Sequence, residues 1–296
     1  MDLQKLELFA SICAHGNLSK AALALDTVPS VLSRQLAALE KESGGRLFHR
    51  TGRGMTLTEL GARIRPRVES ILDQHRQLLQ EIRAQEGVIS GEVRVGIVPS
   101  LAQTIAAPLM RSLSLDYPKI SLQIIEGASG QLDAWRADDL VDLTVLFRRG
   151  SGEMQSEDAV AEVATYLVGP VGDTLTSGTC VSFTALQDLP LVLAPLPNGL
   201  RADIEDTANR LGIDLRIALE TNSLGVQAEI AANGIAYTVM AGHAWVQHRD
   251  TGLQASKIVD PGIVRTVALG LASHRPASEA TRVVSRLARS YLANNL

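Results

Sequence analysis

Long apolar runs, a secretion signal and a cysteine framework are all missing from this sequence of 296 residues. No segment approaches the roughly 18 consecutive apolar residues that a membrane-spanning helix needs. The opening stretch, MDLQKLELF, includes two acids and no apolar core segment, so we expect no secretory signal and a cytoplasmic location. The two cysteines, Cys13 and Cys180, match no metal-binding spacing, and we expect two reduced thiols.

The sequence also lacks the short motifs that mark common enzyme classes. No GxSxG, HExxH, GxGxxG or GxxxxGK(S/T) pattern occurs, and the six histidines are scattered. His243 and His248 are near each other but have no acidic ligand pattern beside them, so we expect neither a metal nor a cofactor. We therefore predict that the protein is not an enzyme.

Charge is unevenly distributed along the chain. The net charge is −4, which by itself argues against a nucleic-acid partner. Residues 1–58, however, contain seven basic and five acidic residues, a net charge of +2. A slightly basic head on an acidic body fits a small nucleic-acid-binding module joined to a second domain.

Three short helices are predicted in the first 43 residues. Apolar residues at helical spacing predict a helix over 3–14, with Gly16 closing it, and a second helix over 18–25 capped by Asn17 or Ser19. A third helix is predicted over 29–43, with Thr27 or the Val28 backbone at its start. Its leucines face a core, and its opposite face carries Ser30, Arg34, Ala37 and Lys41, with Ser33 at the border. This order is typical of a helix-turn-helix.

The segment 44–61 predicts a small hairpin, or wing, with Arg50 and Arg53 at its tip, where basic groups can reach phosphates or a minor groove. A long helix follows over 58–86, with apolar residues stepping by three and four. A single apolar stripe of that length needs a partner, and an antiparallel second copy is the simplest one.

The remaining residues predict an α/β body. The segment 91–147 shows a βαβαβ order, which indicates a parallel sheet with helices on its faces. A second alternating run covers 161–240, and a strand at 265–272 precedes a final helix at 278–292. The body alone would also suit a solute-binding protein, but the missing signal and the helix-turn-helix argue against that class.

The first segment resembles a known family. The stretch GNLSKAALALDTVPSVLSRQLAALEKESGGRLFHRTGRGMTLTELG (16–61) is similar to the winged helix-turn-helix of LysR-type transcriptional regulators, and the rest of the chain agrees in length and order. The matching features are KAA, LSRQLAALE, the LF.RTGRG wing and LT..G. Pro99-Ser100 and NGLR (198–201) resemble the branch that includes nitrogen-assimilation regulators.

The resemblance implies an α/β fold with three parts. These are a winged helix-turn-helix at 1–58, a linker and dimerisation helix at 59–87, and a two-lobed, periplasmic-binding-protein-like (Rossmann-like) effector domain at 91–296. Lobe one would comprise 91–162 and 267–296, and lobe two 163–266. The expected partners are double-stranded promoter DNA, a small-molecule effector, copies of this chain as a dimer or tetramer, and RNA polymerase, with no membrane.

Candidate DNA contacts follow from the motif: Ser19, Lys20, Pro29, Ser30, Ser33, Arg34, Arg50 and Arg53. Arg34 would read bases, while Ser19 and Lys20 would reach phosphates. Pro29 departs from the family pattern, because a glutamine usually stands there. Proline suits a first helical position but removes an amide that can pair with adenine. The alternative for Arg34 is a surface arginine paired with Asp26 or Glu40.

Candidate effector contacts follow from the strand ends, since ligands of open α/β sheets bind beyond the carboxyl ends of the strands. Serines and free N–H groups at helix starts favour a small carboxylate or another anion, and Arg201 could bind a carboxylate as a fork. The alternatives are that Ser100 and Ser129 cap their own helices, and that Arg201 pairs with Asp203 or Glu205. The predicted set is Pro99, Ser100, Leu101, Ala128, Ser129, Phe147, Asn198, Gly199, Leu200, Arg201, Asn222 and Thr238.

Overall fold

The computed structural model describes residues 2–51, 54–83, 88–149, 157–274 and 276–296. The chain divides into two compact units. Unit 1 comprises Met1–Gly91 and Asp138–Leu140, and unit 2 comprises Glu92–Ala137 and Val141–Leu296. Each unit has a hydrophobic core of its own and is described separately.

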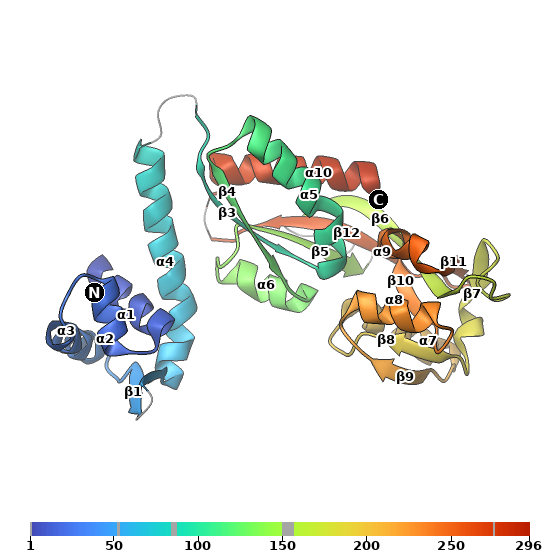
Figure 1. The fold of residues 1–296 in the computed structure, drawn as a ribbon, viewed down its shortest axis with the longest axis horizontal. Coiled ribbons are helices and arrows are strands. Elements are labelled where there is room, and N and C mark those ends of the chain that lie inside the picture. The colour runs from blue at the N-terminus through green and yellow to red at the C-terminus, as the bar shows by residue number, and fades with distance from the viewer. Residues whose placement is uncertain (1, 52–53, 84–87, 150–156, 275) are drawn as a thin grey trace. The chain divides into compact units, whose positions relative to one another are not determined.

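The described part of unit 1 contains four helices and a hairpin (Figure 1). The elements are α1 (Leu3–His15), α2 (Leu18–Ala24), α3 (Pro29–Glu42), β1 (Phe48–Thr51), β2 (Gly54–Leu57) and α4 (Glu59–Arg83). The predicted helix-turn-helix, wing and long helix are therefore all present. Their apolar faces meet in one core, which includes Phe9, Ile12, Leu32, Leu36, Leu39 and Leu47.

Local capping explains where the short helices begin and end. Gly16 takes the left-handed conformation, with φ 59°, and its N–H donates to the carbonyl of Ile12. The Asn17 side chain caps α2 by accepting from the N–H groups of Ser19 and Lys20. Helix α3 begins with Val28 as its N-cap residue and Pro29 in its first turn, without a side-chain cap.

The wing is an antiparallel pair, with Phe48 opposite Leu57 and Thr51 opposite Gly54. Gly54 has φ 134°, and a Cβ on it would lie 2.3 Å from the Gly16 carbonyl oxygen, so this position requires glycine. Glu40 of α3 fixes the base of the wing, because its Oε1 accepts from the backbone N–H groups of Leu47 (2.8 Å) and Phe48 (3.2 Å).

Helix α4 buries one side and exposes apolar residues elsewhere. Val68 and Leu72 belong to the core of unit 1. Ile71, Leu78 and Ile82 are 44%, 53% and 70% exposed, respectively. Among the described residues, no helix has both the length and the apolar character that crossing a bilayer requires.

Unit 2 is built on an eight-stranded sheet with the order β4-β3-β5-β12-β6-β11-β7, and β10 also pairs with β6. A separate parallel pair is formed by β8 and β9. The strands are β3 (Gly91–Ile97), β4 (Ile120–Glu126), β5 (Leu143–Arg149), β6 (Glu157–Pro170), β7 (Cys180–Ser182), β8 (Pro190–Leu193), β9 (Arg216–Glu220), β10 (Thr238–Ala241), β11 (Leu253–Val259) and β12 (Val264–Leu271).

Helices cover these sheets. They are α5 (Pro99–Asp116), α6 (Ser129–Ala137), α7 (Gly199–Leu211), α8 (Leu224–Ala232), α9 (Gly242–His248) and α10 (Glu279–Asn295), with 3-10 turns η1 (Phe183–Leu186) and η2 (Arg249–Thr251). Figure 1 shows α5 and α10 side by side over one face of the β3–β5 region and α6 below it. A hydrogen bond of 2.6 Å between the hydroxyl groups of Ser112 and Tyr291 joins α5 to α10.

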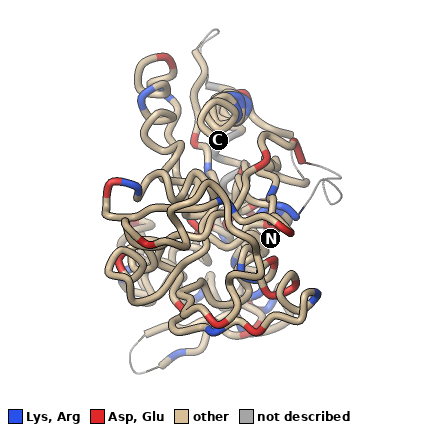
Figure 2. The backbone as a smooth tube through the Cα atoms, turned by 90° about the vertical axis from the view of Figure 1, so that its right-hand side faces the viewer, with Lys and Arg blue, Asp and Glu red and all other residues tan. Residues whose placement is uncertain are grey.

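Basic and acidic residues are interspersed along the chain (Figure 2).

Strand β6 connects the two parts of the sheet, because its first half pairs with β12 and its second half pairs with β10 and β11. Strands β6 and β12 pair antiparallel, and β12 also pairs antiparallel with β5. Strands β3 and β5 are parallel, as expected. The predicted lobe boundaries, after residues 162 and 266, fall inside β6 and β12. The sequence reading missed β7, β11 and α9, which are short or have no clear period.

Candidate functional site

The outer face of α3 is exposed and offers an arginine that has no partner among the described residues. Ser30 and Arg34 are exposed, and Ser33 is partly exposed. The alternative pairing of Arg34 with Glu40 is not formed, because the Glu40 carboxylate binds the wing backbone. No ion pair joins Arg34 to Asp26 either within the described chain. Arg34 is thus available to an external acceptor.

The wing contacts the same face of unit 1. Arg50 donates from Nη2 to Ser33 Oγ at 2.8 Å, which links β1 to α3. Ser19 and Lys20 are exposed at the start of α2, and Pro29 is exposed at the start of α3. Arg53 lies outside the described residues, so its DNA role stays a prediction.

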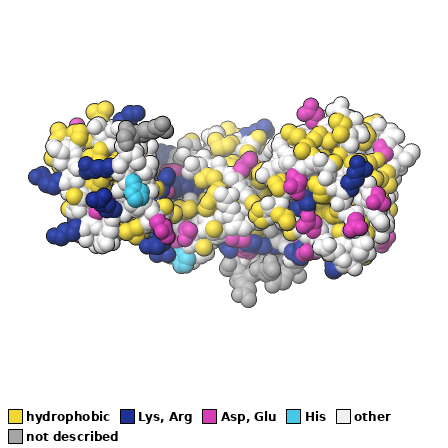
Figure 3. Space-filling view, turned by 90° about the horizontal axis from the view of Figure 1, so that it is seen from below, with side chains coloured by type: hydrophobic (Ala, Val, Ile, Leu, Met, Phe, Trp, Pro, Cys, Tyr) yellow, Lys and Arg dark blue, Asp and Glu magenta, His cyan; other side chains and the backbone are white. Residues whose placement is uncertain are grey.

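Figure 3 shows dark blue basic side chains gathered on unit 1. Among the described residues before α4, the exposed basic ones are Lys20, Arg34, Lys41, Arg46 and Arg50. This surface offers positive charge and hydrogen-bond donors together, which is what a phosphate backbone attracts.

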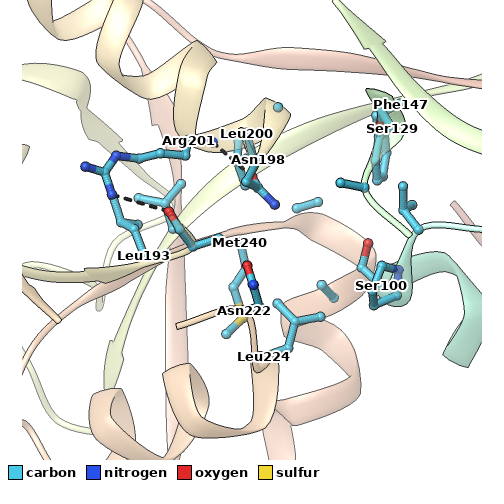
Figure 4. A pocket seen from close by; sticks show the side chains of 18 of the residues that line it. Ser100, Ser129, Phe147, Leu193, Asn198, Leu200, Arg201, Asn222, Leu224 and Met240 are labelled. Carbon is cyan, nitrogen blue, oxygen red and sulfur yellow. Dashed lines mark hydrogen bonds between the residues drawn. The ribbon is translucent and has the colours of Figure 1, made fainter. Parts of the chain in front are cut away.

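In unit 2 a cavity of about 120 Å³ lies where several strands end and helices begin (Figure 4). Its walls come from the starts of α5, α6, α7 and α8 and from β10. Ten of the predicted effector residues line it: Pro99, Ser100, Ala128, Ser129, Phe147, Asn198, Gly199, Leu200, Arg201 and Asn222. Their contact with an effector stays a prediction, but the structure brings them together.

Two predicted effector residues lie outside the lining. Leu101 follows Ser100 in α5, but its side chain is fully buried on the inward face of that helix. Thr238 is also fully buried and donates from Oγ1 to Gln227 Oε1 at 3.2 Å. Gln227 does line the cavity, so Thr238 supports the wall from behind.

The two serines on one side of the cavity have free hydroxyl groups. The N-cap residue of α5 is Val98, and no side chain caps this helix by a hydrogen bond. Ser100 therefore does not cap α5. Within the described residues, neither Ser100 Oγ nor Ser129 Oγ makes a hydrogen bond. Figure 4 shows both residues on the same side of the cavity, opposite Arg201 and Leu200. They can therefore donate to, or accept from, a ligand.

Arg201 is held by the protein itself. Its Nε donates to Glu205 (2.7 Å), and its Nη1 donates to Glu220 (2.9 Å) and to the Ala194 carbonyl (3.3 Å). In Figure 4 its guanidinium points away from Ser100 and Ser129. The pairing with Glu205 was one of the sequence alternatives, and Glu220 of β9 adds a second acid.

The sequence reading missed a second arginine, Arg265 of β12, which also lines the cavity. Arg265 is only 8% exposed, and its guanidinium carbon lies 4.8 Å from the centre of the Phe147 ring. Its Nε is 3.0 Å from Asp203 Oδ2, although the N–H does not point at that oxygen as a hydrogen bond would require. None of the described lining residues is acidic.

A buried histidine lies behind the same wall. The His243 ring stacks on Phe147 at 5.7 Å between centroids, and neither ring nitrogen has a hydrogen-bond partner in the described structure. Burial lowers the pKa of His243 to about 4, because the charged imidazolium would lose its water. The ring is therefore neutral at pH 7.

The geometry defines a class of protein: a DNA-binding module joined to a two-lobed domain with a ligand-sized cavity. Two family models match the chain accordingly. Residues 3–62 match the bacterial regulatory helix-turn-helix protein, lysR family, and residues 86–293 match the LysR substrate binding domain. The chain belongs to the LysR family of DNA-binding transcriptional regulators, and the predicted fold class is confirmed.

Similar proteins agree with this assignment. The nitrogen assimilation regulatory protein nac of Escherichia coli is 23% identical, over 99% of this chain and 96% of its own length. The nac protein of Klebsiella aerogenes is 27% identical, over 81% of this chain and 78% of its own. The likeness to nitrogen-assimilation regulators predicted from the sequence is thereby confirmed.

Solved structures share the fold. A full-length OxyR variant from Pseudomonas aeruginosa superposes with a TM-score of 0.74 at 18% identity, covering 100% of this chain and 99% of that one. Full-length CbnR, complexed with its target DNA, gives a TM-score of 0.72 at 17% identity, with 100% of both chains covered.

The state of His243 predicts a pH dependence of stability. Its pKa is about 4 when folded against a reference of 6.5, so the unfolded chain binds a proton more readily between these values. Unfolding free energy should therefore be intact above pH 6.5 and fall by about 3 kcal/mol as the pH drops to 4. Both tryptophans, Trp135 and Trp245, lie in unit 2, so urea unfolding followed by tryptophan fluorescence reports on this unit.

The matched reference is His243→Leu, which is similar in volume and cannot be protonated. The stability gap between the two proteins should shift in favour of the leucine variant as the pH is lowered. Parallel pH profiles of the two proteins would show that His243 is not the group responsible.

Proposed function

We propose that this regulator binds promoter DNA through the α3 face and the wing, and that a small anionic molecule in the unit 2 cavity changes this binding. The proposal rests on the presence of two features in one chain. Arg34 is exposed and has no partner among the described residues, and the described lining of the cavity has two arginines and no acid. An anion gains from such a lining, whereas a cation does not.

For the DNA side, α3 supplies the groups that read bases. The guanidinium of Arg34 can donate two hydrogen bonds to a guanine, and the hydroxyls of Ser30 and Ser33 can bond to several bases. Pro29 starts the helix without contributing a base-reading amide. The operator would thus be read by fewer side chains than a glutamine at this position would allow.

Backbone contacts would come from residues around that helix. Lys20 and Ser19 are exposed at the start of α2, where the N-terminal end of a helix also favours a phosphate. Arg50 is preorganised by its bond to Ser33, so it loses little freedom on binding. We propose Arg53 as a further contact on the strength of the motif alone.

For self-association, α4 is the proposed surface. Ile71, Leu78 and Ile82 expose apolar area that a second copy of α4 would cover. A dimer presents two α3 helices to an inverted repeat, and a tetramer would present four. Contact with RNA polymerase and a cytoplasmic location are proposed from the family resemblance.

The ligand side rests on Ser100, Ser129 and Asn222, which line the cavity and whose side-chain polar groups have no partner in the described structure. Together with the helix starts around the cavity, they suit a carboxylate or another oxyanion. A ligand bound between the two lobes would change how closely the lobes approach each other. This change would in turn alter the spacing of the helix-turn-helix units of an oligomer.

Arg34→Ala tests the DNA assignment. Loss of a base contact should weaken binding to the promoter region of the protein's own gene by about tenfold or more and relax base preference. Lys20→Ala should instead weaken binding to all sequences and lower the salt slope by about one. Footprinting and fluorescence anisotropy at two salt concentrations distinguish these effects.

Arg210→Ala is the matched control, because it removes an exposed arginine of unit 2. It should leave DNA affinity unchanged. Unaltered protection and salt dependence in both Arg34→Ala and Lys20→Ala would refute the proposed DNA face.

Ile82→Asp tests the self-association surface. An aspartate in an apolar helix pair would be buried without a partner, so association should weaken about tenfold or more. Ile235→Asp is the control, since Ile235 is 67% exposed against 70% for Ile82 but lies in unit 2. Sedimentation velocity over a concentration series measures both, and equal association of the two variants would exclude α4 as the interface.

A further inference from the structure

Arg265 is held in place by three contacts, one from β5 and two from α7. Phe147 of β5 lies under the guanidinium at 4.8 Å, and Asp203 of α7 lies 3.0 Å from Nε. Nη2 lies against Gly199, since a Cβ there would be 2.5 Å from it. The guanidinium therefore sits at the N-terminal end of α7 in a fixed orientation.

The charge of Arg265 is incompletely compensated. Asp203, its ion-pair partner, also accepts a hydrogen bond from Arg149 Nε. Arg149 is further paired with Asp206 at 2.7 Å, whereas Arg265 has no second acid in the described chain. Burial, together with the nearby Arg149 charge, lowers the pKa of Arg265, although Asp203 opposes the shift. A buried cation that shares one carboxylate gains from a further anion.

The terminal nitrogens of Arg265 are the groups that an anion could use. Neither Nη1 nor Nη2 makes a hydrogen bond within the described residues, and only Nε counts among the fully covered atoms. Arg201 is different, because its Nε donates to Glu205, its Nη1 donates to Glu220 and to the Ala194 carbonyl, and its guanidinium points away from the serines (Figure 4). Of the two lining arginines, Arg265 is the one in which both terminal nitrogens are without a hydrogen bond among the described residues.

We propose that Arg265, rather than Arg201, binds the acid group of a small carboxylate at the start of α7. This inference deepens the proposed function and rests on it, since it concerns the same cavity. The Nη groups would form the bidentate contact that suits a carboxylate, and the N-terminal end of α7 adds to the attraction.

The cavity also restricts the rest of the ligand. Its volume of about 120 Å³ compares with the roughly 150 Å³ of an engineered cavity that holds benzene. Leu193, Leu200, Leu224 and Met240 supply an apolar wall. The ligand class that fits is a compact monocarboxylate with an apolar body of up to about ring size.

Direct binding of chosen acids tests this inference. The full-length protein is titrated with acetate, propionate and benzoate at constant ionic strength, and with acetamide, propionamide and benzamide as neutral counterparts, by thermal shift and calorimetry. Saturable binding of an acid, about tenfold tighter than that of its amide, is the expected result. Arg265→Gln should remove this preference, and Arg201→Gln should retain it.

Gly199→Ala provides a second variant that keeps every charge. Its Cβ would displace the guanidinium of Arg265 from this position, so acid binding should weaken while the fold is retained. Arg210→Gln, which removes an exposed arginine further along α7, should bind acids as the wild type does.

Three results would overturn the inference: no saturable acid binding, equal binding of acids and amides, or loss of the preference in Arg201→Gln with its retention in Arg265→Gln. An acid preference that persists in Arg265→Gln would leave the cavity as a ligand site and remove only the role of Arg265. Failure of the proposed regulatory function would appear instead in the promoter-binding measurements, which do not depend on these acids.

Discussion

The antiparallel pairing of β12 with β5 and β6 is the constraint on which the cavity depends. In this register Arg265 lies opposite Arg149, and Val267 lies opposite Phe147. Directly opposed residues in an antiparallel pair share a face, so both arginines and the diagonal Phe147 project to the same side of the sheet. There Asp203 of α7 meets both guanidiniums. The strand register of β12 with β5 thus places residues at the end of β5, in one lobe, next to the first turns of α7, in the other lobe.

A comparable constraint organises unit 1, where Glu40 ties the wing to α3. Its carboxylate satisfies two backbone N–H groups at the entry to β1, and Arg50 returns from β1 to Ser33 on α3. Because Glu40 is used in this way, Arg34 keeps its charge for an external partner. The described part of the wing and α3 are therefore linked by hydrogen bonds in both directions, and such preorganisation lowers the entropy cost of binding a partner.

Much of this architecture could be predicted from local signals. Apolar periodicity located α1, α3 and α4, and Asn17, Gly16 and Pro29 marked helix ends through their own chemistry. The positions of strand ends predicted that Ser100, Ser129 and Asn222 lie close together, and all three line one cavity. Arg265 was missed because it is a single arginine in an apolar strand, and only the β12–β5 register reveals that it stands over Phe147. The second acid on Arg201 was missed for the same reason, since Glu220 arrives from β9.

The central claim is that occupancy of the cavity and DNA binding are coupled. The most direct measurement is the affinity of the full-length protein for its promoter fragment, by anisotropy, with and without a saturating concentration of the acid it binds best. The account predicts a change of about fivefold or more in the wild-type protein, in either direction. No such change is expected in Arg265→Gln under the same conditions. Equal promoter affinity of the wild-type protein with and without bound acid would contradict the account.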